Sequence, residues 1–280
     1  MEKEALTQAA LVHRFRALHA SGCFLLPNPW DRGTARALEQ LGFAALATTS
    51  AGFAFSRGQV DGAVPRDEML AHIREIVATT SLPVNADFLN GFADAPEAVA
   101  ANVGLCVEIG VAGVSIEDST GRKEQPLYDK ELAIARIAAA RAAIDGSGVP
   151  VVLTARCEAF LVDAPEALRV VLERLPAYAA VGADCLYAPG VSEPTEIAAI
   201  VRAVQPLPVN VLVAGFNAHL TQRQLADLGV RRISVGSGLA LAAWGAFQRA
   251  AREMATMGTF SCFKDAARTT EVTEFFTADG

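Results

Sequence analysis

The sequence predicts an α/β fold, a (β/α)8 TIM barrel, from three observations. Eight short apolar segments alternate along the chain with segments of helical periodicity, and the short segments lack polar alternation, as expected of strands buried on both faces. The length of 280 residues fits a barrel, which typically needs about 250. The first strand-to-helix turn, residues 27–31, lacks the glycine-rich sequence of the competing fold, an open doubly wound sheet.

The predicted elements begin with a leading helix within residues 1–20, where apolar residues from Thr7 to Ala20 recur about every 3.6 positions. The strands are expected at residues 23–26, 43–48, 83–86, 113–116, 151–154, 184–187, 209–213 and 232–235. The helices that follow them are expected at residues 32–41, 66–79, 96–109, 130–143, 165–181, 195–204, 221–228 and 239–257. Because no linker or change in composition divides the chain, we expect residues 1–280 to form a single barrel domain.

Two sequence repeats mark boundaries of these elements. Residues 94–97 and 163–166 are near copies of one pattern, an aspartate followed three positions later by a glutamate, which predicts a capping box at the start of each following helix. Residues 82–85 and 207–210 share the sequence Leu-Pro-Val-Asn at the start of two strands. We interpret this second repeat as punctuation at the bottom of the barrel, not as a functional duplication, since proline suits the first residue of a strand.

Composition and charge exclude several classes of function. Hydrophobic residues make up 52% of the chain and charged residues 20%, which is enough apolar surface for a large core. The net charge of −7 and the lack of a basic run argue against nucleic-acid binding, and no apolar run reaches the roughly 18 residues of a membrane span. The first four residues are too charged for a signal peptide, and the five cysteines show no paired spacing, so we expect free thiols and a cytoplasmic location.

Polar residues gather where the predicted strands end. In a barrel, the carboxyl ends of all strands form one face, and that face carries the active site. Asp87 ends the third strand and Arg156 follows the fifth. The other exits supply residues 48–53 and then a loop with Asp61 after the second strand, Glu117 and Asp118 after the fourth, and Glu158 close to Arg156. We therefore expect side chains that are far apart in the sequence to converge.

These side chains have the chemistry of a metal-assisted site for a small anion. Asp61, Asp87 and Glu117 offer the oxygen ligands that Mg²⁺ prefers, whereas the four histidines fall mostly on predicted helices and none pairs with a cysteine as a zinc site would require. Arg156 suits a carboxylate or another oxyanion, and the small residues 50–52 allow backbone N–H groups to approach it. Metal, arginine and amides together would stabilise an enolate.

Simpler interpretations of the same residues stay open. Asp118 is an acid at a strand exit, where it could cap the following helix. Arg156 could pair with Glu158 or Glu117 instead of with a substrate. The functional interpretation is favoured because these residues occur at consecutive strand exits.

The motifs at the strand exits are informative as a set. They are Asn28-Pro29-Trp30-Asp31, Thr49-Ser50-Ala51-Gly52, Val84-Asn85-Ala86-Asp87 with Gly91-Phe92, Gly113-Val114-Ser115-Ile116-Glu117-Asp118, Thr154-Ala155-Arg156, and Arg232-Ile233-Ser234-Val235-Gly236-Ser237-Gly238. In combination they resemble the isocitrate lyase/phosphoenolpyruvate mutase superfamily, outside the isocitrate lyase branch proper, over roughly residues 25–257.

The resemblance implies a barrel enzyme that binds Mg²⁺, or Mn²⁺ in its place, and acts on a small 2-oxo or 2-hydroxy acid through an enolate. It implies that Asp87 is the direct metal ligand and that Asp61 and Glu117 hold metal-bound waters. By the same resemblance, Arg156 and Glu117 are catalytic, and the substrate is bound by Arg156, Ser50 and the backbone around Ala51, Gly52 and Phe53.

The resemblance also implies an assembly. Members of the superfamily exchange their last barrel helix between subunits, commonly as dimers of dimers, so we expect a homo-oligomer, either a dimer or a homotetramer. The apolar run 239–244 and the tail as far as Phe276 fit a C-terminal helical segment, residues 239–280, that serves oligomerisation. The other expected partner is a small anionic substrate.

Two positions depart from the superfamily pattern. The loop of residues 121–126 has neither the Cys nor the His of the Lys-Cys-Gly-His loop in isocitrate and methylisocitrate lyases, so we expect no isocitrate-type cleavage. Leu89 stands where the superfamily has a second acid, and its presence should weaken metal binding by about 10- to 100-fold.

Three kinds of function therefore stay open. The first is a Mg²⁺-dependent lyase that acts by oxaloacetate-like decarboxylation or C–C cleavage, with a phosphoenolpyruvate or phosphonopyruvate mutase or hydrolase as the alternative within the superfamily. The second is a phosphate-binding barrel enzyme that uses the turn Val235–Gly238 after the last strand. The third is a non-catalytic barrel that has lost metal binding through Leu89.

Overall fold

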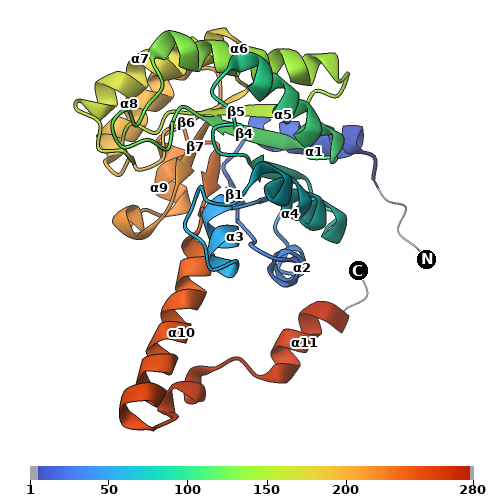
Figure 1. Cartoon of the computed structure of the whole chain (residues 1–280), viewed down its shortest axis with the longest axis vertical. Helices are drawn as coiled ribbons and strands as arrows, with labels where there is room; N and C mark the ends of the chain where they lie inside the picture. Colours follow the sequence, from blue (N-terminus) through green and yellow to red (C-terminus); the bar gives the residue numbers. More distant parts are fainter. Residues whose placement is uncertain (1–5, 278–280) are drawn as a thin grey trace.

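The computed structural model describes residues 6–277 and contains eight parallel strands in one sheet (Figure 1). The strands are β1 (Phe24–Leu26), β2 (Leu46–Ala47), β3 (Val84–Asp87), β4 (Gly113–Glu117), β5 (Val152–Arg156), β6 (Cys185–Tyr187), β7 (Val209–Leu212) and β8 (Arg232–Ser234). Each overlaps its predicted range, so all eight predicted strands are confirmed. The outermost residues of the predicted domain, 1–5 and 278–280, lie outside the described residues.

The order of the strands in the sheet is β1-β8-β7-β6-β5-β4-β3-β2, so each strand lies beside its neighbours in sequence and the last returns to the first. β1 and β8 pair in parallel, for example Leu25 with Ile233. At the remaining seam, the Ala47 N–H donates to the Pro27 carbonyl over 3.0 Å, which brings β2 beside the end of β1. This nearly closed arrangement confirms the predicted (β/α)8 barrel.

Helices alternate with the strands and surround the barrel (Figure 1). They are α1 (Gln8–Ala20), α2 (Arg32–Gln40), α3 (Ser50–Ser56), α4 (Arg66–Thr79), α5 (Pro96–Glu108), α6 (Lys130–Gly146), α7 (Ala167–Ala180), α8 (Pro194–Val204), α9 (Gln222–Asp227), α10 (Gly238–Met257) and α11 (Thr269–Thr277), with 3-10 turns at Gly215–Asn217 and Ser261–Asp265. The predicted helices all occur, but α3 was not predicted. Its 7 residues are too few to show a helical period, although the Thr49 hydroxyl caps it by accepting from the Gly52 N–H at 3.1 Å.

The two predicted capping boxes are wrong. α5 begins at Pro96 with Ala95 as its N-cap, and Asp94 instead accepts hydrogen bonds from the Tyr128 hydroxyl and, at 2.9 Å, from Arg122. α7 begins later than predicted, after Glu166, whose backbone has a φ of +53° and whose side chain makes no cap. Both predictions were based on neighbouring residues alone. At Asp94 the carboxylate binds side chains that are distant in the sequence instead of the backbone N–H groups of α5.

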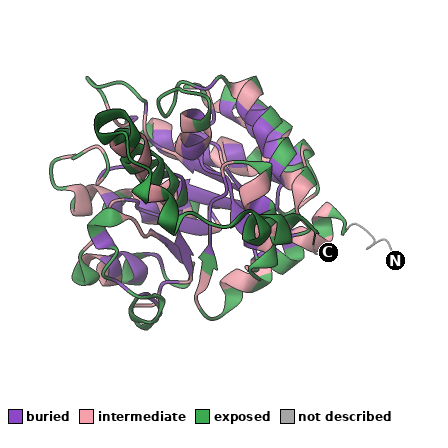
Figure 2. Cartoon of the chain, turned by 90° about the horizontal axis from the view of Figure 1, so that it is seen from below, coloured by how far each residue is buried: buried purple, intermediate pink, exposed green. Residues whose placement is uncertain are grey.

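Buried residues, purple in Figure 2, occur on the strands and on the helices around them, and many of them are apolar. Ile73 of α4, Val103 of α5 and Ile137 of α6 are examples, and each is at most 3% exposed. Inside the barrel several buried side chains are polar, although barrel interiors are usually filled by branched apolar residues. Six buried side chains there are polar: Asn85, Ser115, Thr154, Asn210, Arg232 and Ser234.

The C-terminal segment leaves the barrel and returns to it. α10 projects away from the barrel, and α11 comes back beside α2 (Figure 1), where Arg36 donates to the Phe276 carbonyl over 3.0 Å. Much of α10 is exposed (Figure 2), including large apolar side chains such as Leu241 and Phe247. The role of this segment in oligomerisation, and the exchange of a helix between subunits, stay predictions.

Two expectations from the sequence concern membrane-spanning segments and the state of the cysteines. Within residues 6–277, no helix combines the length and the apolar character needed to cross a membrane. All five cysteines are free thiols: Cys106, Cys157 and Cys185 are buried, and Cys23 and Cys262 are partly exposed.

Candidate active site

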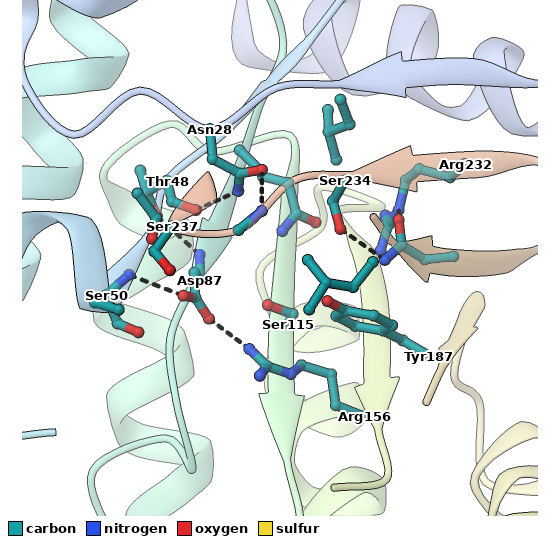
Figure 3. Close-up of a pocket in the computed structure, with 18 of the residues that line it drawn as sticks. Asn28, Thr48, Ser50, Asp87, Ser115, Arg156, Tyr187, Arg232, Ser234 and Ser237 are labelled. Atoms are coloured by element: carbon teal, nitrogen blue, oxygen red, sulfur yellow. Dashed lines mark hydrogen bonds and ion pairs between the residues drawn. The ribbon is translucent and has the colours of Figure 1, made fainter. Parts of the chain in front are cut away.

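Asp87 lies at the carboxyl end of β3, where three different segments hold it (Figure 3). Its backbone N–H donates to the Thr48 hydroxyl over 2.9 Å. One carboxylate oxygen accepts from the Ser50 N–H, the first amide of α3, at 2.9 Å, and the other accepts from Arg156 Nη1 at 2.7 Å. The unexpected helix α3 therefore directs its amino end, which favours negative charge, at Asp87.

Arg156 lies at the end of β5 and joins three carboxylates. Nη1 contacts Asp87 at 2.7 Å, Nη2 contacts Glu117 at 3.1 Å, and Nε contacts Glu158 at 2.9 Å. The side chains of all four residues are at most 17% exposed. Asp87, Glu117 and Arg156 thus meet at one rim, as the strand exits predicted, and Arg156 pairs with both Glu117 and Glu158, as the simpler interpretation also allowed.

Burial and repulsion set the charges at this rim. Burial raises the pKa of Glu117 well above its ordinary value, and the charges of Glu158 and Asp87 add to that effect while Arg156 opposes it. Burial likewise raises the pKa of Glu158. Burial alone would lower the pKa of Arg156, but the three carboxylates outweigh it and raise that pKa, so the guanidinium stays charged. The rim has excess negative charge, which a bound cation would relieve.

A cavity of about 150 Å³ runs from the rim into the barrel interior (Figure 3). Its walls at the rim include Ser50, Ala51, Asp61, Asp87 and Arg156, and deeper inside they include Asn85, Ser115, Tyr187, Asn210, Arg232 and Ser234. The Arg156 guanidinium lies 5.2 Å from the centre of the Tyr187 ring. Burial raises the pKa of Tyr187 to about 12, so this wall carries a neutral phenol at ordinary pH.

Asp61 stands at the mouth of the cavity, on the loop between α3 and α4. Desolvation raises its pKa, and the charge of Asp87 raises it further. Asp61 and Asp87 both line the cavity. The structure therefore brings all three predicted metal-binding carboxylates to one end of the barrel.

Two of the predicted substrate-binding residues lie away from the cavity. Gly52 packs against the start of α10, because a Cβ at Gly52 would stand 3.1 Å from Trp30 Cβ and 3.3 Å from Ala240 Cβ. Phe53 turns outward and stacks on His72, with the ring centres 3.8 Å apart. Their backbone N–H groups are used within α3, by the Thr49 hydroxyl and the Thr49 carbonyl. Ser50 and Ala51 are the members of this set that line the cavity.

Asp118 has a structural position and does not cap the following helix. One of its oxygens accepts from the Glu158 N–H at 2.8 Å. The other accepts from Arg174 at 2.9 Å and from the Tyr178 hydroxyl at 2.7 Å. Asp118 thereby fixes the backbone that carries Glu158.

Leu89 lies in the turn that follows β3, with a φ of +48°. Its carbonyl accepts the Glu117 N–H at 3.0 Å, so the turn ties the exits of β3 and β4 together. Such a backbone conformation is uncommon for leucine and is adopted more readily by aspartate and asparagine. Position 89 thus has a backbone suited to the acid that the superfamily carries there.

The deeper wall of the cavity was not predicted. Asn85 and Asn210 are the last residues of the two Leu-Pro-Val-Asn repeats, and both side chains line the cavity. The prolines of the repeat directly precede β3 and β7, as the interpretation as punctuation predicts, and the asparagines in addition form part of the cavity wall. A polar residue in an otherwise apolar buried strand was the available signal, and it also marks Arg232 and Ser234.

Two backbone N–H groups of the turn after β8 already have a hydrogen-bond partner within the protein. The Asn28 side chain accepts the N–H groups of Val235 and Gly236 at 3.0 and 2.9 Å, and it donates to the Thr48 carbonyl at 2.8 Å. Asn28 therefore joins the exits of β1, β2 and β8. A phosphate that used the Gly236 amide would have to displace Asn28, so the geometry favours a structural turn.

The donor set at the rim fits a hard divalent cation. Mg²⁺ usually takes one or two protein carboxylates and keeps several waters, so it needs no dense cluster of ligands. Within residues 6–277, no three His, Cys, Asp or Glu side chains are arranged so that they could hold a metal ion together. Asp87 and Asp61 offer oxygens at the cavity wall, and Glu117 shares Arg156 with Asp87.

Acids and one arginine thus lie at the carboxyl ends of barrel strands, beside a small polar cavity, on the face where barrel enzymes carry their active sites. The chain belongs to the phosphoenolpyruvate phosphomutase family, whose family model matches residues 15–255, and so to the isocitrate lyase/phosphoenolpyruvate mutase superfamily. It is an enzyme of the lyase or mutase type.

Three relatives illustrate the match. A structure from Burkholderia cenocepacia J2315, provisionally assigned as a lyase/mutase, is 50% identical with a TM-score of 0.92 over 97% of both chains. A Mycobacterium tuberculosis protein without an assigned function is 34% identical over 225 residues, 80% of this chain and 81% of the relative. The 2-methylisocitrate lyase of Escherichia coli K12 is 32% identical over 172 residues, 59% of this chain and 56% of that enzyme.

Proposed function

We propose that this protein is a Mg²⁺-dependent lyase that acts on a small 2-oxo or 2-hydroxy carboxylic acid through an enolate. One observation carries the proposal: Asp87 and Glu117, from two separate strands, each lie within hydrogen-bonding distance of Arg156 on a third, and Asp87 and Arg156 line the mouth of a polar cavity. That juxtaposition supplies negative charge for a cation and positive charge for a carboxylate side by side. A site of this kind stabilises negative charge that develops on an oxygen next to a carboxylate.

Each residue of the site would have its own role in binding the cation or the substrate. Asp87 would hold the cation directly, with Asp61 and Glu117 accepting from its waters, and Mn²⁺ could replace Mg²⁺. The bound ion would supply Lewis-acid stabilisation of the enolate. Arg156 uses three of its five N–H groups on carboxylates, which leaves two for the substrate. Ser50 and Ala51, at the amino end of α3, would contact the substrate from the other side.

The reaction we propose is oxaloacetate-like decarboxylation or C–C cleavage, and not isocitrate-type cleavage. The loop that carries the catalytic Cys and His in isocitrate-type enzymes is here folded onto its own surroundings, with Arg122 bound to Asp94 at 2.9 Å. Among the described residues, those that line the cavity include no histidine, cysteine or lysine. The reaction would then draw on the ion, Arg156 and the raised pKa of nearby carboxyl groups such as Asp61.

The proposed function is tested with a panel of 2-oxo and 2-hydroxy acids. Release of pyruvate and of CO₂ is measured with Mg²⁺, after removal of metal with EDTA, and after addition of Mg²⁺ or Mn²⁺ again. We expect turnover of at least one acid to be lost with EDTA and restored by either ion. Equal turnover with and without EDTA, or no turnover of any acid, would contradict the proposal and leave a non-catalytic barrel as the better description.

The match to the phosphoenolpyruvate phosphomutase family supports one alternative reaction. In that case the substrate would be phosphoenolpyruvate or phosphonopyruvate, and a P–C bond would be made, moved or hydrolysed. Phosphorus NMR separates the outcomes, because a mutase interconverts two organic phosphorus species and a hydrolase releases inorganic phosphate. The same metal and arginine site would serve either reaction.

Replacing Leu89 with aspartate is expected to tighten Mg²⁺ binding by about 10- to 100-fold, because it adds an acid beside the Asp87 site. The backbone at position 89 should accept the change, since aspartate tolerates a φ of +48° better than leucine does. Calorimetric titration of Mg²⁺ in the presence of oxalate measures the effect. Leu89→Asn is the matched control, because it suits the same backbone without adding charge. An unchanged affinity in Leu89→Asp would show that position 89 does not face the ion.

A further inference from the structure

Arg232 is a buried cation inside the barrel, below the rim. It lies on β8 and is only 2% exposed. Nε donates to Asn210 Oδ1 at 2.9 Å, Nη2 donates to the Thr154 hydroxyl at 3.0 Å, and Nη1 lies 3.3 Å from His19 Nε2. A guanidinium at this depth is unusual in a barrel interior, which ordinarily consists of branched apolar side chains.

The three partners of Arg232 carry no negative charge. Asn210 and Thr154 are neutral by nature, and burial followed by the charge of Arg232 lowers the pKa of His19 to about 3. His19 Nδ1 lies 2.8 Å from the Phe15 carbonyl and so carries the hydrogen, which leaves Nε2 as the acceptor for Arg232. Among the described residues, no carboxylate forms an ion pair with Arg232. A buried charge without a counter-ion is costly, so a bound anion would stabilise it.

The same cavity that reaches the rim is lined by Arg232. Figure 3 shows Arg232 and Ser234 on the opposite side of the cavity from Ser50 and Asp87. Thr154 and Asn85 each lie two residues before a rim residue on their strands, Arg156 and Asp87, which places them roughly 7 Å deeper in the barrel.

Two groups at this depth have unused hydrogen-bonding capacity. Arg232 has five N–H groups, and only three have partners among the described residues. Asn85 Oδ1 is buried and has no hydrogen-bond partner in the described chain. The chamber therefore offers donors for an anion and an acceptor for a hydroxyl group or a water beside it.

We propose that Arg232, with Asn210, Ser234 and Asn85 around it, forms an inner subsite for a second carboxylate of the substrate. This proposal rests on the proposed function and deepens it: the substrate would be a dicarboxylic acid whose reacting end lies at the rim and whose other end reaches into the barrel. Because the two levels are roughly 7 Å apart, two or three carbon atoms between the ends fit the span. A carboxylate held by a guanidinium keeps its charge, so Arg232 would serve to recognise and orient this second carboxylate.

The test compares pairs of ligands that differ only at the far end. Linear 2-oxo dicarboxylates of four and five carbons are titrated calorimetrically with Mg²⁺ present, alongside 2-oxo monocarboxylates of equal length. At least one dicarboxylate should bind the wild-type protein about 10- to 100-fold more tightly than its partner. In Arg232→Met this preference should disappear while the affinity for the monocarboxylates changes by less than about threefold. Arg232→Lys should keep part of the preference.

Arg231→Met is the matched control, because Arg231 precedes Arg232 on the chain and donates outside the barrel, to the Gly22 carbonyl at 3.2 Å. It removes one positive charge from the protein and should leave the preference intact. Equal losses for both ligand classes in Arg232→Met would overturn the proposal and assign Arg232 a purely structural role. Absence of any preference in the wild type would also overturn it, and that comparison needs no variant to fold.

The failure of the proposed function has a separate signature. If neither oxalate nor any 2-oxo acid binds at the rim with Mg²⁺, that function is wrong. The inner subsite is then examined by thermal shift with succinate and glutarate, without metal. A stabilisation of the wild type by either acid that Arg232→Met lacks would support the subsite, and no stabilisation of the wild type would overturn it.

Discussion

Turnover of the Asp87→Asn variant should fall by on the order of 10³-fold or more relative to the wild type. The exchange keeps the shape of the side chain, so the hydrogen bond from the Ser50 N–H can persist, but it removes the charge that would hold the cation. Lewis-acid stabilisation of a developing charge contributes several kcal/mol, and each 1.36 kcal/mol corresponds to about tenfold in rate. The measurement is kcat with saturating Mg²⁺, together with the Mg²⁺ affinity by calorimetry.

The matched control for this experiment is Asp94→Asn. Asp94 follows the same strand and is also bound to an arginine, but it lies on the Tyr128 and Arg122 side of the loop and does not line the cavity. We expect its turnover to stay within about threefold of the wild type. If Asp87→Asn kept more than a tenth of the wild-type turnover, the ion would have to be held elsewhere.

Replacing Arg156 with methionine should lower kcat/KM by about 10²- to 10³-fold and also destabilise the fold. The loss of rate follows from removing a preorganised positive group beside the reacting anion. The loss of stability follows from leaving Asp87, Glu117 and Glu158 buried without their common partner, and breaking a buried pair in this way costs about 3–5 kcal/mol.

The destabilisation should depend on pH with a definite sign. Burial raises the pKa of Glu117 and Glu158 in the folded protein, and Arg156 opposes that rise, so the variant should have still higher values. A carboxyl group with a raised pKa stabilises the fold fully below its unfolded value, and that stability is lost as the pH rises through the folded value. Urea unfolding at pH 5 and pH 8 should therefore show the larger deficit at pH 8.

Arg156→Lys separates the two effects of this substitution. It keeps a positive charge near the carboxylates, so most of the stability should return, but it lacks the planar fork that reaches three carboxylates at once. Turnover should therefore stay reduced by about tenfold or more. A lysine variant with wild-type turnover would show that Arg156 acts only through its charge.

Much of the fold could be predicted because its signals are local. Short apolar strands, proline at the start of β3 and the regular alternation with helices determine a barrel without reference to distant contacts. The rim residues Asp87, Glu117 and Arg156 could be predicted for the same reason, since position at a strand exit is enough to place them on one face. Their mutual pairing needed the structure.

The interior of the barrel could not be predicted in the same way. Whether Asn85, Asn210 and Arg232 face inward depends on the phase of each strand and on the register between strands, and a shift of one residue reverses the face. The capping pattern at Asp94 misled for a related reason, because its hydrogen bonds go to Tyr128 and Arg122, 34 and 28 residues away. Helix α3 was too short for periodicity to reveal.

The tight packing at Gly52 connects the start of the C-terminal segment with the helix that holds Asp87. A Cβ at Gly52 would stand 2.6 Å from Thr49 Cγ2, 3.1 Å from Trp30 Cβ and 3.3 Å from Ala240 Cβ. The first turn of α3 is therefore tightly packed against the start of α10 at Gly52, and it donates to the Asp87 carboxylate from the Ser50 N–H. Truncating the C-terminal segment should consequently alter the turnover, although its described residues contribute nothing to the cavity lining.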